Sequence, residues 1–344
     1  MDFGPSAAAA ASWVEGDESA VDWDTLARRV DTFSSRAYFA NYFGHKLPLL
    51  ATTVRHLRAQ RDDNRIVFFV GDSSLDAKHW LFPDPDDKEL GPHSLPARRG
   101  YEKFLLPPVV AVPDACHWFN ARSEERKSRF VAVNTAVEAS TLKDRTGGGR
   151  SLGQDLLVRD SLREQDAIVV SVGGNDIALR PSLSTMAAVA WLALAAGDDA
   201  VRTGTAAGYG RLRQMFSHDL TAYLQMLTSK TKPSKIILCC IYYPCESGQG
   251  WADPLLNLLG YRAENEAKCR RVQQLLDTVF RDFISTIKLD GVEIIPVALG
   301  RVLNASNPAH YENRVEPSVE GCRLMGQTFL DILEGDLHES MFVK

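Results

Sequence analysis

Five short apolar runs recur along the chain. Each is rich in β-branched residues and bounded by polar or turn residues, and they are Ile66–Val70, Phe130–Val133, Ala167–Val172, Lys235–Tyr242 and Val292–Val297. A strand with one face in water alternates apolar and polar residues, whereas a strand covered on both faces is apolar nearly throughout. The runs therefore predict the strands of a parallel sheet that is buried on both faces.

Helical periodicity fills the segments between these runs. It is clearest in Tyr209–Ser229, whose large apolar residues fall on one helix face. The other predicted helices are Leu49–Gln60, Leu152–Gln165, Ala263–Ile287 and Val319–Leu333. Strands alternating with helices predict an α/β fold, a three-layer α/β/α sandwich with right-handed crossovers. For five strands we expect the flavodoxin-like order 2-1-3-4-5.

Two segments are longer than minimal connections, and we treat residues 75–129 and 181–210 as insertions. The first is rich in proline, aspartate and aromatic residues, and we expect it to cross or flank the carboxyl edge of the sheet. The second carries an alanine-rich helix followed by a glycine-rich loop. Long excursions at this edge often build a pocket or a lid, although simple surface elaboration is an equal alternative.

The chain beyond the amino terminus is predicted to be a single domain, residues 31–344. Residues 1–30 are expected to be a flexible leader, because the alanine run at 7–11 is too short and too weakly apolar for a signal peptide and no basic segment precedes it. No apolar stretch is long enough for a membrane span.

Charge and cysteine content narrow the function classes. The net charge is −5 with both signs interspersed, so no basic surface indicates a nucleic-acid partner. The six cysteines show neither CxxC nor metal-ligand spacing, so we expect free thiols in a reducing, cytoplasmic compartment, with no metal and no cofactor.

Polar and small residues follow the first three predicted strands, as Gly71–Asp76, Asn134–Thr141 and Gly173–Asp176. A serine on a tight glycine turn, Ser73, can present its hydroxyl at the sheet edge, and the amide of Asn175 can stabilise an oxyanion. Each motif alone is also explained as a turn or a helix cap. Because the carboxyl ends of parallel strands are adjacent, we expect all three motifs to converge on one crevice.

Together these motifs resemble the SGNH, or GDSL-type, hydrolases. The resemblance implies that Ser73 is the nucleophile and that its own N–H is an oxyanion donor. It also implies a second donor at Ala139, where the family has glycine, and a side-chain donor in Asn175. Asp72 and Gly174 are expected to line the substrate site.

The last block of the resemblance is divergent. The family pattern DxxHP supplies the catalytic acid and histidine, whereas this chain has NxxEP, with Asn313 and Glu316 at those positions. A serine hydroxyl needs a base to become a good nucleophile. His310, in the same loop, and Glu316 are both candidates, although Glu316 has structural alternatives, an ion pair with Arg314 or a helix cap.

We therefore expect an intracellular serine hydrolase or acyltransferase that acts on a small ester or acyl substrate in a mostly apolar pocket. Two alternatives remain open. The chain has the features of an SGNH scaffold that binds a small molecule or a protein without catalysis, or of one repurposed for non-hydrolytic chemistry assisted by carboxylates.

Overall fold

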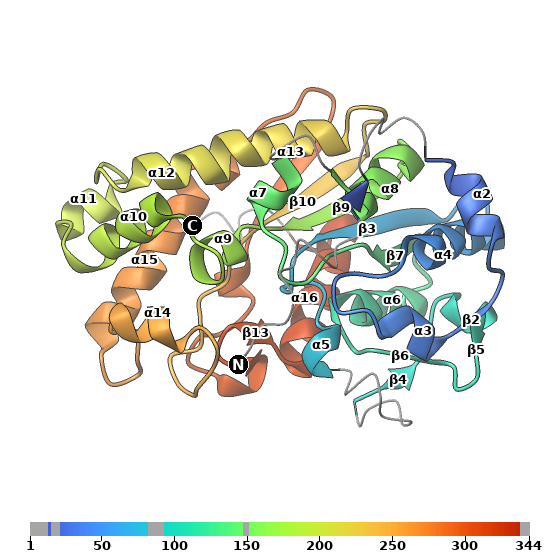
Figure 1. Ribbon diagram of the computed structural model, residues 1–344, viewed down its shortest axis with the longest axis horizontal. Coiled ribbons are helices and arrows are strands. Elements are labelled where there is room, and N and C mark those ends of the chain that lie inside the picture. The colour runs from blue at the N-terminus through green and yellow to red at the C-terminus, as the bar shows by residue number, and fades with distance from the viewer. Residues whose placement is uncertain (1–12, 15–20, 82–92, 147–150, 338–344) are drawn as a thin grey trace.

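The central sheet has five parallel strands in the order β11-β10-β9-β3-β7 (Figure 1). The structure is a computed structural model that describes residues 13–14, 21–81, 93–146 and 151–337. The strands are β3 (Arg65–Gly71), β7 (Phe130–Asn134), β9 (Ala167–Ser171), β10 (Lys235–Cys240) and β11 (Glu293–Ala298). In chain order this is 2-1-3-4-5, so the predicted α/β class and flavodoxin-like order are confirmed.

Helices cover both faces of the sheet. One face carries α4 (Leu47–Gln60), α8 (Gly153–Ser161), α13 (Leu220–Leu227) and α15 (Glu266–Asp282), and the other carries α6 (Ala115–Glu125) and α16 (Val319–Glu334). In β3, Phe68 and Val70 pack with the first group, while Val67 and Phe69 pack with the second. Both sets of side chains are buried, which explains why the strands are apolar throughout.

The register of the strands brings the loops after β3, β7 and β9 together. Gly71 pairs with Ser171 of β9, and Phe69 pairs with Asn134 of β7. Beyond the ladder, the Val137 N–H donates to the Gly71 carbonyl at 2.9 Å. The three motifs therefore begin side by side at the carboxyl edge of the sheet.

The predicted insertion at residues 75–129 contains more regular structure than expected. It includes α5 (Lys78–Leu81), the short strands β4 (Leu95–Pro96), β5 (Leu105–Leu106) and β6 (Val110–Ala111), and the crossover helix α6. Part of this segment, residues 82–92, lies outside the described residues. Helix α6 is buried between the sheet and α16, so its sequence lacks a regular polar face and gives little helical signal.

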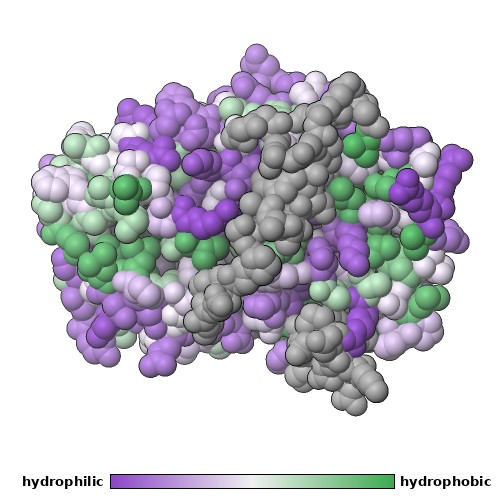
Figure 2. Space-filling view, viewed as in Figure 1, coloured by the Kyte–Doolittle hydropathy of each residue, from purple (hydrophilic) through white to green (hydrophobic). Residues whose placement is uncertain are grey.

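The predicted insertion at 181–210 contains α10 (Leu183–Leu194), as expected, and then α11 (Asp198–Arg202) in part of the predicted loop. Helix α10 has no charged residue and is apolar on both sides. Its outer side exposes large apolar side chains, which belong to Leu183, Met186, Trp191 and Leu194. Figure 2 shows the apolar surface around this part of the molecule.

The segment predicted as the helix Tyr209–Ser229 is helical but not uniform. It forms α12 (Tyr209–Arg213), a π-helix (Gln214–Asp219) and α13. Met215 and Phe216 in the π turn are both buried, so the predicted apolar face is kept through the irregular segment.

The expected flexible leader does not hold for residues 21–30. Helix α2 (Trp23–Arg28) lies against α4, where the Thr52 hydroxyl donates to the carbonyl of Ala27 at 2.9 Å. The Trp23 indole N–H donates to Asp160 at 3.0 Å. Strand β1 (Trp13–Val14) pairs with β8 (Ser151–Leu152), while residues 1–12 and 15–20 lie outside the described part of the chain.

Within the described ranges, no helix is long and apolar enough to cross a membrane. All six cysteines are buried and free.

We expect the core between α16 and the sheet to contribute strongly to the stability of the fold. Phe329 is fully buried and its ring lies 5.7 Å from that of Phe69. Phe329→Ala should lower the free energy of unfolding by about 3–5 kcal/mol in urea titrations. Leu183→Ala, at a side chain that is 85% exposed, should change it by less than about 0.5 kcal/mol. Equal losses would contradict the assigned core.

Candidate functional site

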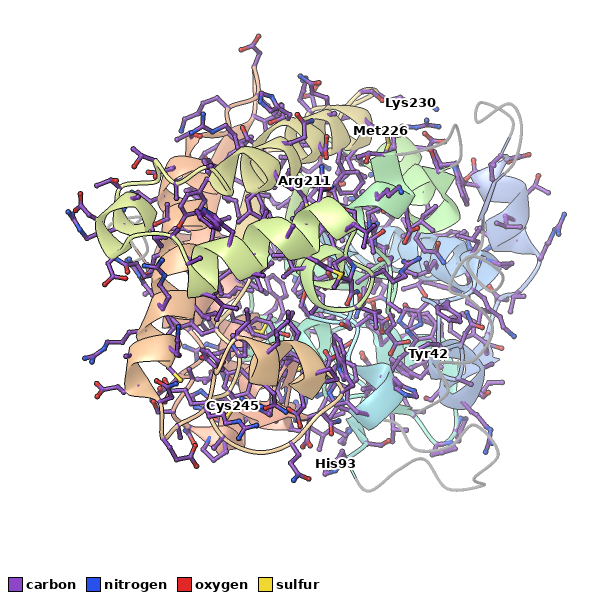
Figure 3. The ribbon with its side chains drawn as sticks, turned by 60° about the vertical axis from the view of Figure 1, so that its left-hand side comes forward. Tyr42, His93, Arg211, Met226, Lys230 and Cys245 are labelled. Atoms are coloured by element: carbon purple, nitrogen blue, oxygen red, sulfur yellow. The ribbon has the colours of Figure 1, made fainter. Side chains whose placement is uncertain are left out.

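A cavity of ≈ 120 Å³ opens at the carboxyl edge of the sheet. Its polar end is formed by residues that the sequence singled out, Asp72, Ser73, Gly174, Asn175 and Glu316. Its deeper walls are aliphatic and come mainly from α10, α14 (Asp253–Leu258) and α15. In the view of Figure 3, α10 crosses the front of this region and α14 lies below it.

The turn after β3 is rigid and presents Ser73 to the cavity. A Cβ on Gly71 would lie 2.2 Å from the Ser171 carbonyl oxygen, so only glycine permits this approach of the two strands. The Asp72 N–H donates to the same carbonyl at 3.1 Å, and an Asp72 carboxylate oxygen accepts the Ser74 N–H at 3.0 Å. The Ser74 hydroxyl is bonded to the Ser171 hydroxyl at 2.7 Å. Ser73 alone of the two serines remains partly exposed.

Glu316 lies against Ser73, although the two residues are far apart in sequence. It belongs to β13 (Glu316–Pro317), which pairs with β12 (Tyr311–Glu312), and it is only 6% exposed. Its carboxyl accepts the Trp251 indole N–H at 3.1 Å. It lines the same cavity as Ser73, whose side chain is close enough to lower the pKa of this carboxyl. The sequence position that resembles the histidine of the last block is thus occupied by a carboxyl group in contact with the serine.

The ionisation of Glu316 is opposed by its surroundings. Burial raises its pKa from 4.5 to about 8, and the nearby Asp72 carboxyl adds to this rise, whereas the hydrogen bonds from Trp251 and Ser73 lower the pKa. Burial also raises the pKa of Asp72. A carboxyl whose pKa is near neutrality can both accept and return a proton, which is the property required of a general base.

Asn175 and the loop after β7 lie on the other side of Ser73. The Asn175 amide nitrogen donates one N–H to the Ser140 carbonyl at 2.9 Å, which leaves its second N–H for a ligand. Ala139 has a φ of +56°, a left-handed conformation that glycine adopts more easily. Its carbonyl accepts a hydrogen bond from Arg180 at 2.8 Å. Ala139 borders the site through Ser140 and does not itself line the cavity.

Gly174 begins the short helix α9 (Gly174–Ala178) and lines the cavity. The preceding Gly173 has a φ of +103°, and a Cβ there would lie 2.7 Å from the Phe216 ring. The tight turn therefore brings the backbone of α9 close to Ser73.

The histidines that could replace Glu316 as base lie elsewhere, both the predicted candidate His310 and two in the first insertion, His79 and His117. His310 is not among the residues that line the cavity, and its ring nitrogen accepts the backbone N–H of Asn304 at 3.0 Å. His79 is exposed beside the Tyr42 ring, at 4.5 Å between ring centroids. His117 is buried in α6, where burial lowers its pKa to about 4.

Arg314 forms its ion pair with Asp253. Its guanidinium binds Asp253 at 2.8 Å, so the alternative ion pair with Glu316 is not formed. Among the described residues, no group of histidine, cysteine, aspartate and glutamate side chains is placed to hold a metal ion.

Sequence reasoning missed Trp251. The residue lies in the loop after β10, at the same carboxyl edge that identified the other motifs, and it follows Gly248 and Gly250. An aromatic residue in a glycine-containing loop after a central strand was the available signal.

No protein-family profile matches the sequence, and no curated protein matches it. Solved structures are similar over most of the chain. A carbohydrate acetylesterase from Sinorhizobium meliloti is 14% identical with a TM-score of 0.39, covering 80% of this chain and 100% of that one. An extracellular lipase from Streptomyces rimosus is 12% identical with a TM-score of 0.41, covering 79% and 100%. An aryl esterase from M. smegmatis is 13% identical with a TM-score of 0.36, with the same coverage as the lipase.

The raised pKa of Glu316 predicts a characteristic pH dependence of stability. The folded state holds this proton more tightly than the unfolded state, so the contribution is complete below pH 4.5 and is lost as the pH rises through about 8. Relative to Glu316→Gln, the wild-type free energy of unfolding should fall by up to about 4 kcal/mol between about pH 5 and 9.

Urea titrations across this range measure the effect. The matched control is Glu312→Gln, at the exposed cross-strand neighbour of Glu316, which should keep the wild-type pH dependence. Parallel plots of unfolding free energy against pH for the wild type and Glu316→Gln would show that burial does not raise the pKa of this carboxyl.

Proposed function

We propose that the protein is a serine hydrolase of the SGNH type that cleaves esters with a short apolar acyl group, with Ser73 as nucleophile and Glu316 as general base. The observation that carries this proposal is that the Glu316 carboxyl and Ser73 lie together at the polar end of an otherwise apolar cavity. A serine nucleophile needs a base within reach of its hydroxyl for acyl transfer.

In the proposed reaction the Ser73 oxygen attacks the ester carbonyl carbon while its proton moves to the Glu316 carboxylate. The tetrahedral intermediate collapses, the bond to the alcohol breaks, and the alcohol oxygen takes the proton from Glu316. Water then attacks the acyl-serine with Glu316 again as base, and the carboxylic acid and free Ser73 are released. Glu316 must be ionised to start the cycle, so the rate should increase with pH through about 8.

The donors available for the oxyanion lie on three segments, after β3, β7 and β9. The second N–H of the Asn175 amide and the backbone N–H of Ser73 are the principal donors in this proposal, and the backbone N–H of Ala139 is the third. Donors fixed before the reaction stabilise the developing charge without reorganisation, and the loss of one costs roughly 10²–10³-fold in rate. The hydrogen bonds from Asn175 to the Ser140 carbonyl and from Arg180 to the Ala139 carbonyl supply this rigidity.

The walls of the cavity indicate the acyl group. They are formed by aliphatic residues such as Val189, Ala193, Leu255 and Leu276. A volume of ≈ 120 Å³ is somewhat less than the roughly 150 Å³ of an engineered apolar cavity that accepts benzene. A chain of about four to six carbons therefore fits the apolar part of the site.

The nucleophile is tested by labelling with a fluorophosphonate and by hydrolysis of p-nitrophenyl butyrate. Ser73→Ala should lose the label and at least about 10³-fold in rate. Glu316→Gln should react about 10²–10⁴-fold more slowly because its amide cannot take the proton.

Ser74→Ala is the matched control. Its hydroxyl is bonded to Ser171, so the variant should remain labelled at Ser73 when the modified peptide is mapped. Labelling and turnover that survive in Ser73→Ala would show that another residue is the nucleophile. Absence of both in the wild type would leave a binding protein as the better description.

The acyl cavity is tested by filling it from α10. Ala193→Phe places a ring in the cavity and should reduce hydrolysis of the hexanoate ester relative to the acetate ester by about tenfold or more. Ala187→Phe changes the exposed side of the same helix and should leave this ratio unchanged. If both variants alter the ratio equally, the acyl chain does not occupy this cavity.

A further inference from the structure

The hydrogen bond from Trp251 to Glu316 has no counterpart among the residues that the sequence resemblance implies. The indole nitrogen lies 3.1 Å from Oε1 of Glu316, on a carboxyl group that also contacts Ser73. An indole N–H donates only and cannot take the proton. It therefore fixes one carboxylate oxygen and favours the ionised form.

Trp251 is held firmly relative to Glu316. The buried Arg314, two residues before Glu316, donates to the carbonyls of Cys245 and Tyr261 at 3.2 and 2.8 Å and pairs with Asp253. The Cys245 N–H donates back to the Arg314 carbonyl at 2.7 Å. These bonds lock the loop that carries the base to the segment 245–261.

The loop that carries Trp251 and the loop that carries Glu316 also touch at Gly250. A Cβ on Gly250 would lie 1.9 Å from the Asn313 carbonyl oxygen, so the backbones before Trp251 and before Glu316 touch. The Gly250 N–H is held by Asp253 at 3.0 Å. The indole is thus positioned by its backbone and does not depend on a mobile side-chain contact.

The other polar groups around Glu316 do not replace this donor. Asp72, on the Ser73 turn, has a like charge and opposes ionisation. Tyr242, after β10, donates its hydroxyl to the Val315 carbonyl at 2.7 Å. Tyr42 and Cys322 approach Glu316 from the amino-terminal segment and α16, and the Glu316 charge raises the pKa of both, after burial as the main cause.

We propose that Trp251 is the positioning residue for the base: its N–H orients the Glu316 carboxylate toward Ser73 and stabilises the carboxylate when it forms. This inference rests on the proposed function. It assigns to an indole the task that a buried aspartate performs in a Ser-His-Asp triad, where the third residue holds the base in the correct orientation. An aspartate would be unsuitable here, because a second anion would suppress ionisation of a carboxylate base.

The segment of Trp251 has a second contact with the site. Trp251, Ala252, Leu255 and Leu256 line the acyl cavity, so the structural unit that orients the base also forms the wall against which the acyl chain packs. Filling the cavity and orienting the base are therefore linked in one element, α14 with its preceding loop.

The variant Trp251→Phe, in the full-length protein, keeps an aromatic side chain and removes the N–H. We expect the midpoint of kcat/KM against pH for p-nitrophenyl butyrate to move up by about one pH unit or more. The smaller ring changes the cavity wall, so KM also changes, but that change is the same at every pH. A purely structural role would lower the rate at all pH values without moving the midpoint.

The matched control is Trp80→Phe. The Trp80 indole N–H donates to the backbone carbonyl of Pro317 at 2.9 Å, so this variant loses the same kind of bond on the same loop but none to the carboxyl. It should not move the midpoint. An unshifted midpoint in Trp251→Phe, or equal shifts in the two variants, overturns the proposal.

A second measurement needs no turnover and no folded Trp251→Phe protein. With 5-fluorotryptophan in the wild-type chain, one of the six tryptophan ¹⁹F resonances should titrate near pH 8, and Glu316→Gln should abolish this titration. Absence of such a resonance overturns the inference. Absence of esterase activity with the titration present overturns the proposed function but preserves the control of Glu316 by Trp251.

Discussion

A single buried guanidinium, that of Arg145, joins the parts on which the site depends. It pairs with Asp155 of α8, donates to the Tyr223 hydroxyl of α13 at 2.9 Å, and reaches the carbonyl of Gly71 and, at 2.9 Å, the hydroxyl of Ser140. Through the contacts with Gly71 and Ser140, the Arg145 guanidinium binds both the turn that carries Ser73 and the loop that carries Ala139. Removing one member of a buried ion pair leaves an uncompensated charge. The relative position of nucleophile and oxyanion loop is therefore tied to the packing of two helices far from the substrate.

Glu316 is buried, yet as the proposed base it must carry a charge to act. Apolar walls lower the local dielectric constant, which strengthens electrostatic interactions, but the same burial raises the pKa of the Glu316 carboxyl to about 8. A neutral histidine would accept a proton without first carrying a charge, whereas a carboxylate must be charged to act. The Trp251 and Ser73 hydrogen bonds partly offset the effect of burial, and the proximity of Asp72 adds to it.

The sheet and half of the site follow from local patterns. Apolar runs predicted the strands, and their order was taken from flavodoxin-like sheets with five strands. Motifs at strand ends predicted that Ser73, the loop of Ala139 and Asn175 meet at one edge, because parallel strands place their carboxyl ends together. The choice between His310 and Glu316 was beyond such reasoning, since both lie in one loop and only the fold of β12 and β13 decides which faces Ser73. Helices α2 and α6 were missed, since buried helices and short terminal helices show little amphipathic periodicity.

The pairing of Ser73 with Glu316 also has a consequence for how the protein is made. The two residues lie near opposite ends of the described chain, and β13 is followed only by α16 before those residues end. During synthesis Ser73 therefore leaves the ribosome well before Glu316 does. Under the proposed mechanism, Ser73 has no base until β13 has been made and has paired with β12. A chain truncated before β13 is then expected to be unreactive toward esters.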